Sequence, residues 1–222
     1  SGLTDRGVTG HRTHMNVLAL EFSTEAGSLA LLREDGVVAS ATLDAGMRRS
    51  QKIFDAVTEL LAGAGSSLGE MDAFAVGRGP GSYTGLRVSL TAANGWALPA
   101  GKTVWTVSSG AALAAEILAE QPAVSSVAVW GDARRGQMWA GRFERDDKQV
   151  LRQTEPWQLL PMDSQGTVWT DAHWVASNQR PQAEWVRRLL LAGGDSEELQ
   201  PVYLNPAVAI APRFGADGKP LA

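Results

Sequence analysis

The sequence predicts an α/β protein built from two related halves. Apolar runs follow one another at 17–20, 28–33 and 37–43, so we expect an antiparallel meander that feeds a mixed sheet. Helical and strand patterns then alternate, and a second, shorter series of strands begins at Ser126. This order suggests an old duplication of one strand-strand-strand-helix-strand-helix unit, with a boundary near residue 105.

Each predicted element has its own signal. Glu34-Asp35-Gly36 is typical of a hairpin turn, and Ser50 is expected to cap a helix that ends at Gly63 and Gly65. The apolar residues of that helix fall on one face: Ile53, Phe54, Val57, Leu60 and Leu61. We then expect strands at 73–76 and 103–107, helices at about 86–98 and 110–120, strands at 126–130 and 137–143, a weak strand at 149–152, a loop-rich part marked by Trp157, Trp169 and Trp174, and a helix from Pro181.

Three segments follow from this pattern. Residues 1–14 precede the first methionine and are polar, which predicts a disordered leader or upstream extension. We expect residues 15–105 to form the first lobe. Residues 106–222 form a reduced second lobe with a C-terminal segment.

Composition excludes several classes of function. The chain has 222 residues, a formal net charge of −4 and charges of both signs in each half, so autonomous binding to nucleic acid is not expected. It has no cysteine, which excludes disulfides and thiolate metal sites and fits a reducing cytoplasm. No apolar run approaches the ~20 residues of a membrane-spanning helix, so we expect a soluble, cytoplasmic protein.

The stretch from Gly77 to Arg87 is the most unusual part of the sequence. It follows a buried strand, contains four glycines and Pro80, and leads at once into a helix with the cap-forming residues Ser82 and Thr84. Its spacing matches neither the P-loop nor the dinucleotide fingerprint. Two interpretations stay open: an anion site at a helix start, or a tight turn packed against the neighbouring lobe.

The helix expected at about 86–98 is apolar on two sides. One stripe is made by Leu86, Leu90, Ala93 and Ala97, and the other by Val88, Ala92, Gly95 and Trp96. Such a helix must be covered twice, and small residues allow a second helix to come close. One cover is the chain's own sheet. The other is either a partner or the rest of the chain's own lobe.

Few residues are suited to catalysis or metal binding. Glu21 and Asp132 both follow strands and are candidates for a magnesium ligand or a base, although capped turn residues are the commoner case. His173 is the one histidine beyond the leader. A metal site built mainly on histidine therefore cannot be assembled, and a Ser-His-Asp triad would have to use His173.

The run 76–87 resembles the signature of the bacterial TsaB (YeaZ) family. Similar segments are the opening strand and turn at 18–24, the Asp-Ala-Arg turn at 131–136 and the Pro-x-Tyr-Leu motif at 201–204. The family commonly has Asp where this chain has Glu21. The signature residues are Gly79, Pro80, Gly81, Ser82, Thr84, Gly85 and Arg87. The resemblance implies an actin-like ATPase or sugar-kinase fold with two βββαβα-related lobes, the second reduced.

The resemblance also implies a role without catalysis. The related transferase TsaD carries a His-x-x-x-His metal pair, and its positions fall here on Ser109 and Leu113, so we expect no metal, no cofactor and no catalytic residue. Glu21, Ser23, Thr24 and Asp132 would mark a vestigial cleft.

The implied partners are TsaD and the small ATPase TsaE, with self-association when TsaD is absent. TsaD transfers threonylcarbamoyl to the adenosine beside the anticodon of tRNA. The predicted partner interface consists of Ile53, Phe54, Val57, Leu61, Leu86, Leu90, Ala93 and Ala97. We expect the change Leu90→Glu to abolish the heterodimer and leave the fold intact.

Three other functions remain in competition: an ATP-dependent phosphotransferase that uses Glu21 and Asp132, a glycoprotease-like peptidase, and a stand-alone tRNA binder. Micromolar binding of ATP with Mg²⁺, accompanied by turnover, would favour the phosphotransferase.

Overall fold

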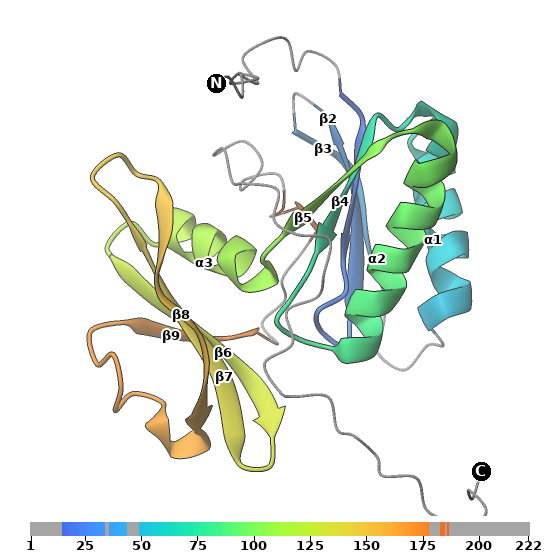
Figure 1. Cartoon of the computed structure of the whole chain (residues 1–222). Helices are drawn as coiled ribbons and strands as arrows, with labels where there is room; N and C mark the ends of the chain where they lie inside the picture. Colours follow the sequence, from blue (N-terminus) through green and yellow to red (C-terminus); the bar gives the residue numbers. More distant parts are fainter. Residues whose placement is uncertain (1–14, 34–35, 44–48, 178–182, 185, 187–222) are drawn as a thin grey trace, which may run out of the picture.

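The computed structural model describes residues 15–33, 36–43, 49–177, 183–184 and 186. Within these residues the chain forms two β-sheets with one helix between them and two helices on the outer face of the first sheet (Figure 1). The strands are β1 (Val17–Glu21), β2 (Gly27–Arg33), β3 (Gly36–Leu43), β4 (Ala73–Gly77), β5 (Thr103–Val107), β6 (Ser126–Arg134), β7 (Gln137–Arg145), β8 (Leu151–Pro161) and β9 (His173–Ala176). The helices are α1 (Arg49–Gly63), α2 (Tyr83–Ala97) and α3 (Ser109–Glu120).

The first sheet has the strand order β3-β2-β1-β4-β5. Strands β1, β2 and β3 form an antiparallel meander, and β4 and β5 continue the sheet in parallel with β1. The expected meander and mixed sheet are therefore confirmed. The element order β1-β2-β3-α1-β4-α2-β5-α3 also reproduces the βββαβα unit that the sequence predicted for the first lobe.

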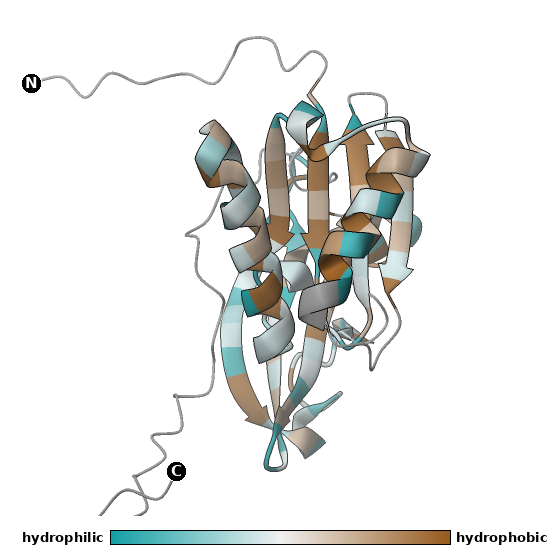
Figure 2. Ribbon diagram, turned by 90° about the vertical axis from the view of Figure 1, so that its right-hand side faces the viewer, coloured by the Kyte–Doolittle hydropathy of each residue, from teal (hydrophilic) through white to brown (hydrophobic). Residues whose placement is uncertain are grey.

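The two faces of the first sheet carry side chains of different size. Because side chains alternate along a strand, Leu18 and Leu20 of β1 face one way and Val17 and Ala19 the other. The leucines pack in the core formed with α1 and α2, which lie across the same face (Figure 2). The smaller pair packs in the core that includes α3. Small residues on this second face leave room for α3 to approach closely.

The second sheet has the order β8-β7-β6-β9, with β6 and β9 parallel and the other neighbours antiparallel. Helix α3 lies between the two sheets and contributes to both cores (Figure 1). Its residues Ala112 and Ala115 pack with the first sheet, while Leu113 and Leu118 pack with the second. This shared helix joins the two lobes.

Several predicted details differ from the structure. Helix α2 begins at Tyr83 rather than near residue 86, because Ser82 caps it by accepting a hydrogen bond from the amide of Gly85 at 3.3 Å. Helix α1 begins at Arg49, so Ser50 lies inside its first turn. The boundary placed near residue 105 falls inside β5, whose last residue is Val107.

The tryptophan-containing part of the second lobe is more regular than predicted. Trp157 lies in the eleven-residue strand β8 and Trp174 lies in β9, so only Trp169 of the three is in a turn. Trp157 is enclosed by two glycines, because a Cβ at Gly110 of α3 or at Gly141 of β7 would collide with its ring. The long strand was missed because polar residues interrupt its apolar pattern.

Some predictions fall outside the described residues: the leader at 1–14, the turn residues at 34–35, most of the helix expected from Pro181, and the motif at 201–204. In the part of the chain that the structure describes, none of the helices combines the length and the apolar character that crossing a membrane requires.

Candidate functional site

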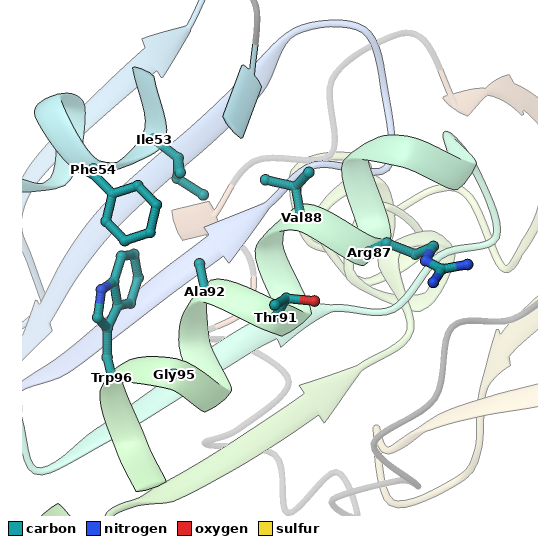
Figure 3. A pocket seen from close by; sticks show the side chains of 8 residues that line it. All are labelled: Ile53, Phe54, Arg87, Val88, Thr91, Ala92, Gly95 and Trp96. Carbon is teal, nitrogen blue, oxygen red and sulfur yellow. The ribbon is translucent and has the colours of Figure 1, made fainter. Parts of the chain in front are cut away.

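An open groove of about 520 Å³ runs between α1 and α2 on the outer side of the first lobe (Figure 3). We call it the α1–α2 groove. Its lining is mostly apolar and comes from both helices: Ile53, Phe54, Arg87, Val88, Thr91, Ala92, Gly95 and Trp96.

Two aromatic rings form one end of the groove. Phe54 of α1 is 50% exposed, and its ring meets the ring of Trp96 edge-on with centroids 5.5 Å apart. Trp96 also lies 5.9 Å from the buried ring of Phe74 in β4, which holds the indole in place. At Gly95 no heavy atom outside its own stretch of helix lies within 4 Å of the position that a Cβ would take, so the groove is open above this residue.

The other end of the groove is polar. Arg87 lies with its guanidinium 5.2 Å from the ring centroid of Tyr83 and donates a hydrogen bond to the Tyr83 hydroxyl. In Figure 3 its side chain points away from the two aromatic rings. The groove therefore combines an apolar floor with a single cationic end.

The predicted partner interface needs correction. Seven of its eight residues are buried in the chain's own core, and Phe54 alone is exposed. Ile53, Val57 and Leu61 face the first sheet, and Leu90 is 5% exposed in the same core. The physical reason is that the larger apolar stripe of each helix covers the sheet. The buried residues are Ile53, Val57, Leu61, Leu86, Leu90, Ala93 and Ala97.

The sequence nevertheless contained the signal for the groove. Val88, Ala92, Gly95 and Trp96 form the second apolar stripe of α2, and all of them line the groove. The sequence pattern identified this stripe, but we placed the expected interface on the other one.

The glycine loop, residues 77–82, is packed rather than open. The amide of Arg78 donates to the carbonyl of Val107 at 2.9 Å, and the amide of Ser82 donates to the carbonyl of Ser23 at 2.6 Å. Gly79 exchanges two hydrogen bonds with Ser109: its amide donates to Oγ and its carbonyl accepts from the Ser109 amide, both at 3.0 Å. Because these donors are used within the chain, the geometry favours the packed turn over the anion site.

The candidate cleft residues after β1 are also enclosed. Glu21 is 1% exposed, and its Oε1 accepts a hydrogen bond from the amide of Ser23 at 2.7 Å. Burial raises the pKa of Glu21 above its ordinary value of 4.5, and the nearby Ser23 and Ser109 lower it by less. Thr24 donates its hydroxyl to the carbonyl of Ala26 at 2.8 Å. Glu21 and Ser23 thus face the protein interior, whereas Thr24 is half-buried in the turn.

Asp132 acts as a turn residue. It lies near the end of β6, opposite Met138 of β7, and its carboxylate accepts a hydrogen bond from the amide of Arg134 at 2.6 Å where the register shifts before the turn. Arg134 and Arg135 both adopt left-handed backbone conformations, with φ of 70° and 56°. Among the described residues, no group of three or more His, Cys, Asp or Glu side chains is placed to hold a metal ion.

The two positions that correspond to the TsaD histidines are buried. Ser109 and Leu113 are each 1% exposed. Ser109 is bonded to the glycine loop, and Leu113 packs against the second sheet. Both side chains are therefore closed off from solvent.

Comparisons with known proteins agree with the fold. Residues 37–156 match a family model described as "TsaD: tRNA N6-adenosine threonylcarbamoyltransferase". The chain is 34% identical over 146 residues to the tRNA threonylcarbamoyladenosine biosynthesis protein TsaB of Escherichia coli (strain K12), covering 66% of this chain and 62% of that protein. It is 33% identical over 130 residues to TsaB of Bacillus subtilis (strain 168), covering 59% and 56%. The chain thus spans about three-fifths of the length of these curated relatives.

The structural comparison extends further along the chain. The structure of YeaZ from Pseudomonas aeruginosa superimposes with a TM-score of 0.70 at 31% identity and covers 86% of this chain and 100% of that one. Together with the βββαβα order of the first lobe, this match confirms the two-lobed α/β fold that the family resemblance implied. The chain therefore belongs to the TsaB (YeaZ) family, within the broader group that the TsaD model describes.

Proposed function

We propose that this chain is a non-catalytic scaffold subunit in the biosynthesis of threonylcarbamoyladenosine on tRNA. It docks TsaD through the α1–α2 groove and so supports transfer of threonylcarbamoyl to the adenosine beside the anticodon. The observation that carries this proposal is the open apolar groove on the outer face of the first lobe.

The groove has the composition of a helix-docking surface. Its floor contains Ala92 and Gly95, which allow a partner backbone to come close, and Phe54 and Trp96 provide aromatic anchors. Arg87 is the single charged residue of α2, so this helix presents a nearly uncharged face to solvent. A helix from TsaD laid along α1 and α2 would cover this face, and two such helices would complete a four-helix contact.

Self-association in the absence of TsaD uses the same surface in this proposal, because the groove is apolar and open in a single chain. TsaE joins the complex as a further partner. The protein works in the cytoplasm, where tRNA is modified.

Lack of catalysis is supported by the residues at the predicted metal positions. Ser109 is committed to two hydrogen bonds with Gly79, and Leu113 has an apolar side chain in a packed core. The phosphotransferase alternative is not favoured, because Glu21 is buried and Asp132 caps its own hairpin.

The experiment is to fill the groove without disturbing the fold. The change Gly95→Leu places a Cβ where nothing outside its own stretch of helix lies within 4 Å, and it replaces a helix-interior glycine. We therefore expect a fold that is more stable by roughly 0.5–1 kcal/mol. Affinity for TsaD, measured by calorimetry, should fall at least about tenfold because the partner helix can no longer reach the floor.

The matched control is Gly63→Leu at the end of α1, where a Cβ also meets open space. Gly63 lies nine residues from Phe54, or about 13 Å along the helix. This control should bind TsaD like the unchanged chain. Equal binding by Gly95→Leu and the unchanged chain would exclude the groove as the docking site. Threonylcarbamoyl transfer by the isolated chain would contradict the non-catalytic role.

A further inference from the structure

A small polar cluster is buried where β1, β4 and α3 meet. It consists of Glu21, Ser23, Gly77 and Ser109, and we call it the Glu21 cluster. Glu21, Ser23 and Ser109 are 1%, 4% and 1% exposed. Oε1 of Glu21 accepts the Ser23 amide, whereas Oε2 of Glu21 and Oγ of Ser23 have no well-aligned hydrogen-bond partner among the described residues.

The carboxyl group fits into space that only a glycine leaves. A Cβ at Gly77 would collide with Oε2 of Glu21 and would lie 2.8 Å from Oγ of Ser109. Oε2 and the Ser109 hydroxyl therefore both lie against the bare Cα of Gly77. Oγ of Ser109 already accepts the amide of Gly79, and a hydroxyl oxygen has a second lone pair for another donor.

The protonated form of the carboxyl suits this setting better than the ionised form. A neutral acid at Oε2 can donate to the hydroxyl oxygen of Ser109 or Ser23, which satisfies a buried polar atom. A carboxylate at the same place would carry a charge without water around it. Burial accordingly raises the pKa of Glu21, and the hydroxyls offset this only in part.

Hydroxyls, not charges, face Glu21 from the segments that pack on it. Ser23 comes from the turn after β1 and Ser109 from α3, and these two residues are the ones that influence its pKa. The charged residues of these segments are Glu25 in the turn, Arg78 in the glycine loop, and Glu116 and Glu120 further along α3. Glu25, Arg78 and Glu116 are each engaged in an interaction.

The Glu21 cluster is linked to the start of α2. The amide of Ser82, the cap residue of α2, donates to the carbonyl of Ser23. Gly81 lies so close to that carbonyl that a Cβ would collide with it. On the other side, Gly79 is bonded to Ser109. The glycine loop is thus held between the turn after β1 and the first turn of α3.

We propose that Glu21 is a positioning residue: as a neutral acid it locks the glycine loop between the two lobes and sets the first turn of α2, and its ionisation loosens this lock. The consequence for docking rests on the proposed function, because α2 forms one wall of the α1–α2 groove. The lock itself belongs to the isolated chain.

The folded state binds the proton of the Glu21 carboxyl more tightly than the unfolded state does, and this sets the direction of the pH dependence. The stability from the neutral acid is fully present below about pH 4.5 and is lost as the pH rises through the higher pKa of the folded state. Each unit by which that pKa exceeds 4.5 changes the folding equilibrium tenfold. Glu21→Gln keeps the shape and removes the ionisation, so it should abolish this dependence.

The test compares the full chain with Glu21→Gln between pH 5 and pH 8. Urea unfolding should show the folding equilibrium of the unchanged chain falling relative to that of Glu21→Gln as the pH rises. Hydrogen exchange, corrected for its intrinsic pH dependence, should become faster with rising pH at the Gly79 and Ser82 amides of the unchanged chain, but not at those of Glu21→Gln. Glu120→Gln, an exposed change at the end of α3, is the control and should follow the unchanged chain.

Each outcome decides the matter. A parallel pH response of Glu21→Gln and the unchanged chain would overturn the proposal, as would failure of Glu21→Gln to fold, since a neutral side chain must be accepted here.

The change Ser109→Ala removes the hydroxyl that accepts the Gly79 amide, so exchange of that amide should be faster at every pH. An unchanged exchange rate would overturn the link between Ser109 and the glycine loop. The affinity for TsaD should decrease as the pH rises for the unchanged chain, and it should stay constant for Glu21→Gln. Absence of any TsaD binding would refute the proposed function. The hydrogen-exchange result on the isolated chain would then still test whether Glu21 holds the glycine loop.

Discussion

Gly77 offers a direct test of how closely the lobes are packed at their junction. A Cβ at this position would lie 2.6 Å from Cδ of Glu21 and 2.8 Å from Oγ of Ser109. Non-bonded carbon atoms are comfortable at about 3.5–4.0 Å, so the Glu21 carboxyl must move by about 1 Å or more. It has little room to do so, because it is 1% exposed and bonded to the Ser23 amide.

The expected cost of Gly77→Ala is about 2–3 kcal/mol. Overpacking of a buried site costs about 1–3 kcal/mol. Loss of the hydrogen bond from the Ser23 amide adds about 1 kcal/mol. Replacing glycine by alanine restricts the unfolded chain and returns about 0.4–1 kcal/mol. For a chain of this size the net change corresponds to a fall in Tm of roughly 4–12 °C.

The assay is urea unfolding followed by tryptophan fluorescence. Gly95→Ala is the matched control, because its new methyl group meets open space in a helix and should stabilise by up to about 1 kcal/mol. The double variant Gly77→Ala with Glu21→Ala removes the obstructing carboxyl, so the cost of the methyl group should fall by at least half. If Gly77→Ala unfolds within 0.5 kcal/mol of the unchanged chain (roughly the scatter of neutral surface changes), the packing argument is wrong. Strict additivity of the two changes would refute it as well.

Two further changes test other parts of the first lobe. Leu90→Glu places a carboxylate in a core where Leu90 is 5% exposed, so the loss of packing alone costs about 2–5 kcal/mol and circular dichroism should show unfolding rather than a folded chain that fails to bind. A native spectrum would contradict the burial. Glu70 accepts hydrogen bonds from the Ser66 hydroxyl and the Ser67 amide, and these lower its pKa below 4.5. Its contribution is therefore present above pH 4.5 and lost as the pH falls through the lowered pKa, so unfolding midpoints of Glu70→Gln and the unchanged chain should converge in acid; a constant gap would refute this.

The sequence predicted most of the first lobe because its elements obey simple periodicities. The strands β1 and β2 are continuous apolar runs that are buried on both faces of the sheet, and the apolar residues of α1 recur at the spacing of one helical face, which packs on the sheet. Strand β8 was largely missed for the opposite reason. Its burial pattern is mixed along its length, and Trp157 is enclosed by glycines that lie far away in sequence.

The α1–α2 groove shows a more instructive limit of the sequence pattern. Periodicity identified two apolar stripes on α2, but it carries no information about which stripe meets the sheet and which remains open. The structure buries the stripe with two leucines and leaves the one with Gly95 and Trp96 in the groove. Side-chain size decides this, because leucines fill a core better than glycine or alanine, so the larger stripe is the better guess for the covered side.

The glycine loop resolves into a set of close contacts, each of which needs a missing side chain. A Cβ at Gly77 would meet Glu21, one at Gly79 would lie 2.7 Å from Leu86 Cδ1, and one at Gly81 would meet the Ser23 carbonyl. Each glycine thus admits a neighbour from a different segment. The most distinctive motif of the chain is accordingly a packing junction that connects β1, α2 and α3. The one buried acid at this junction is Glu21, and its carboxyl group can exchange a proton with solvent only when the junction opens. We therefore expect pH to affect docking through the glycine loop and not through the groove itself.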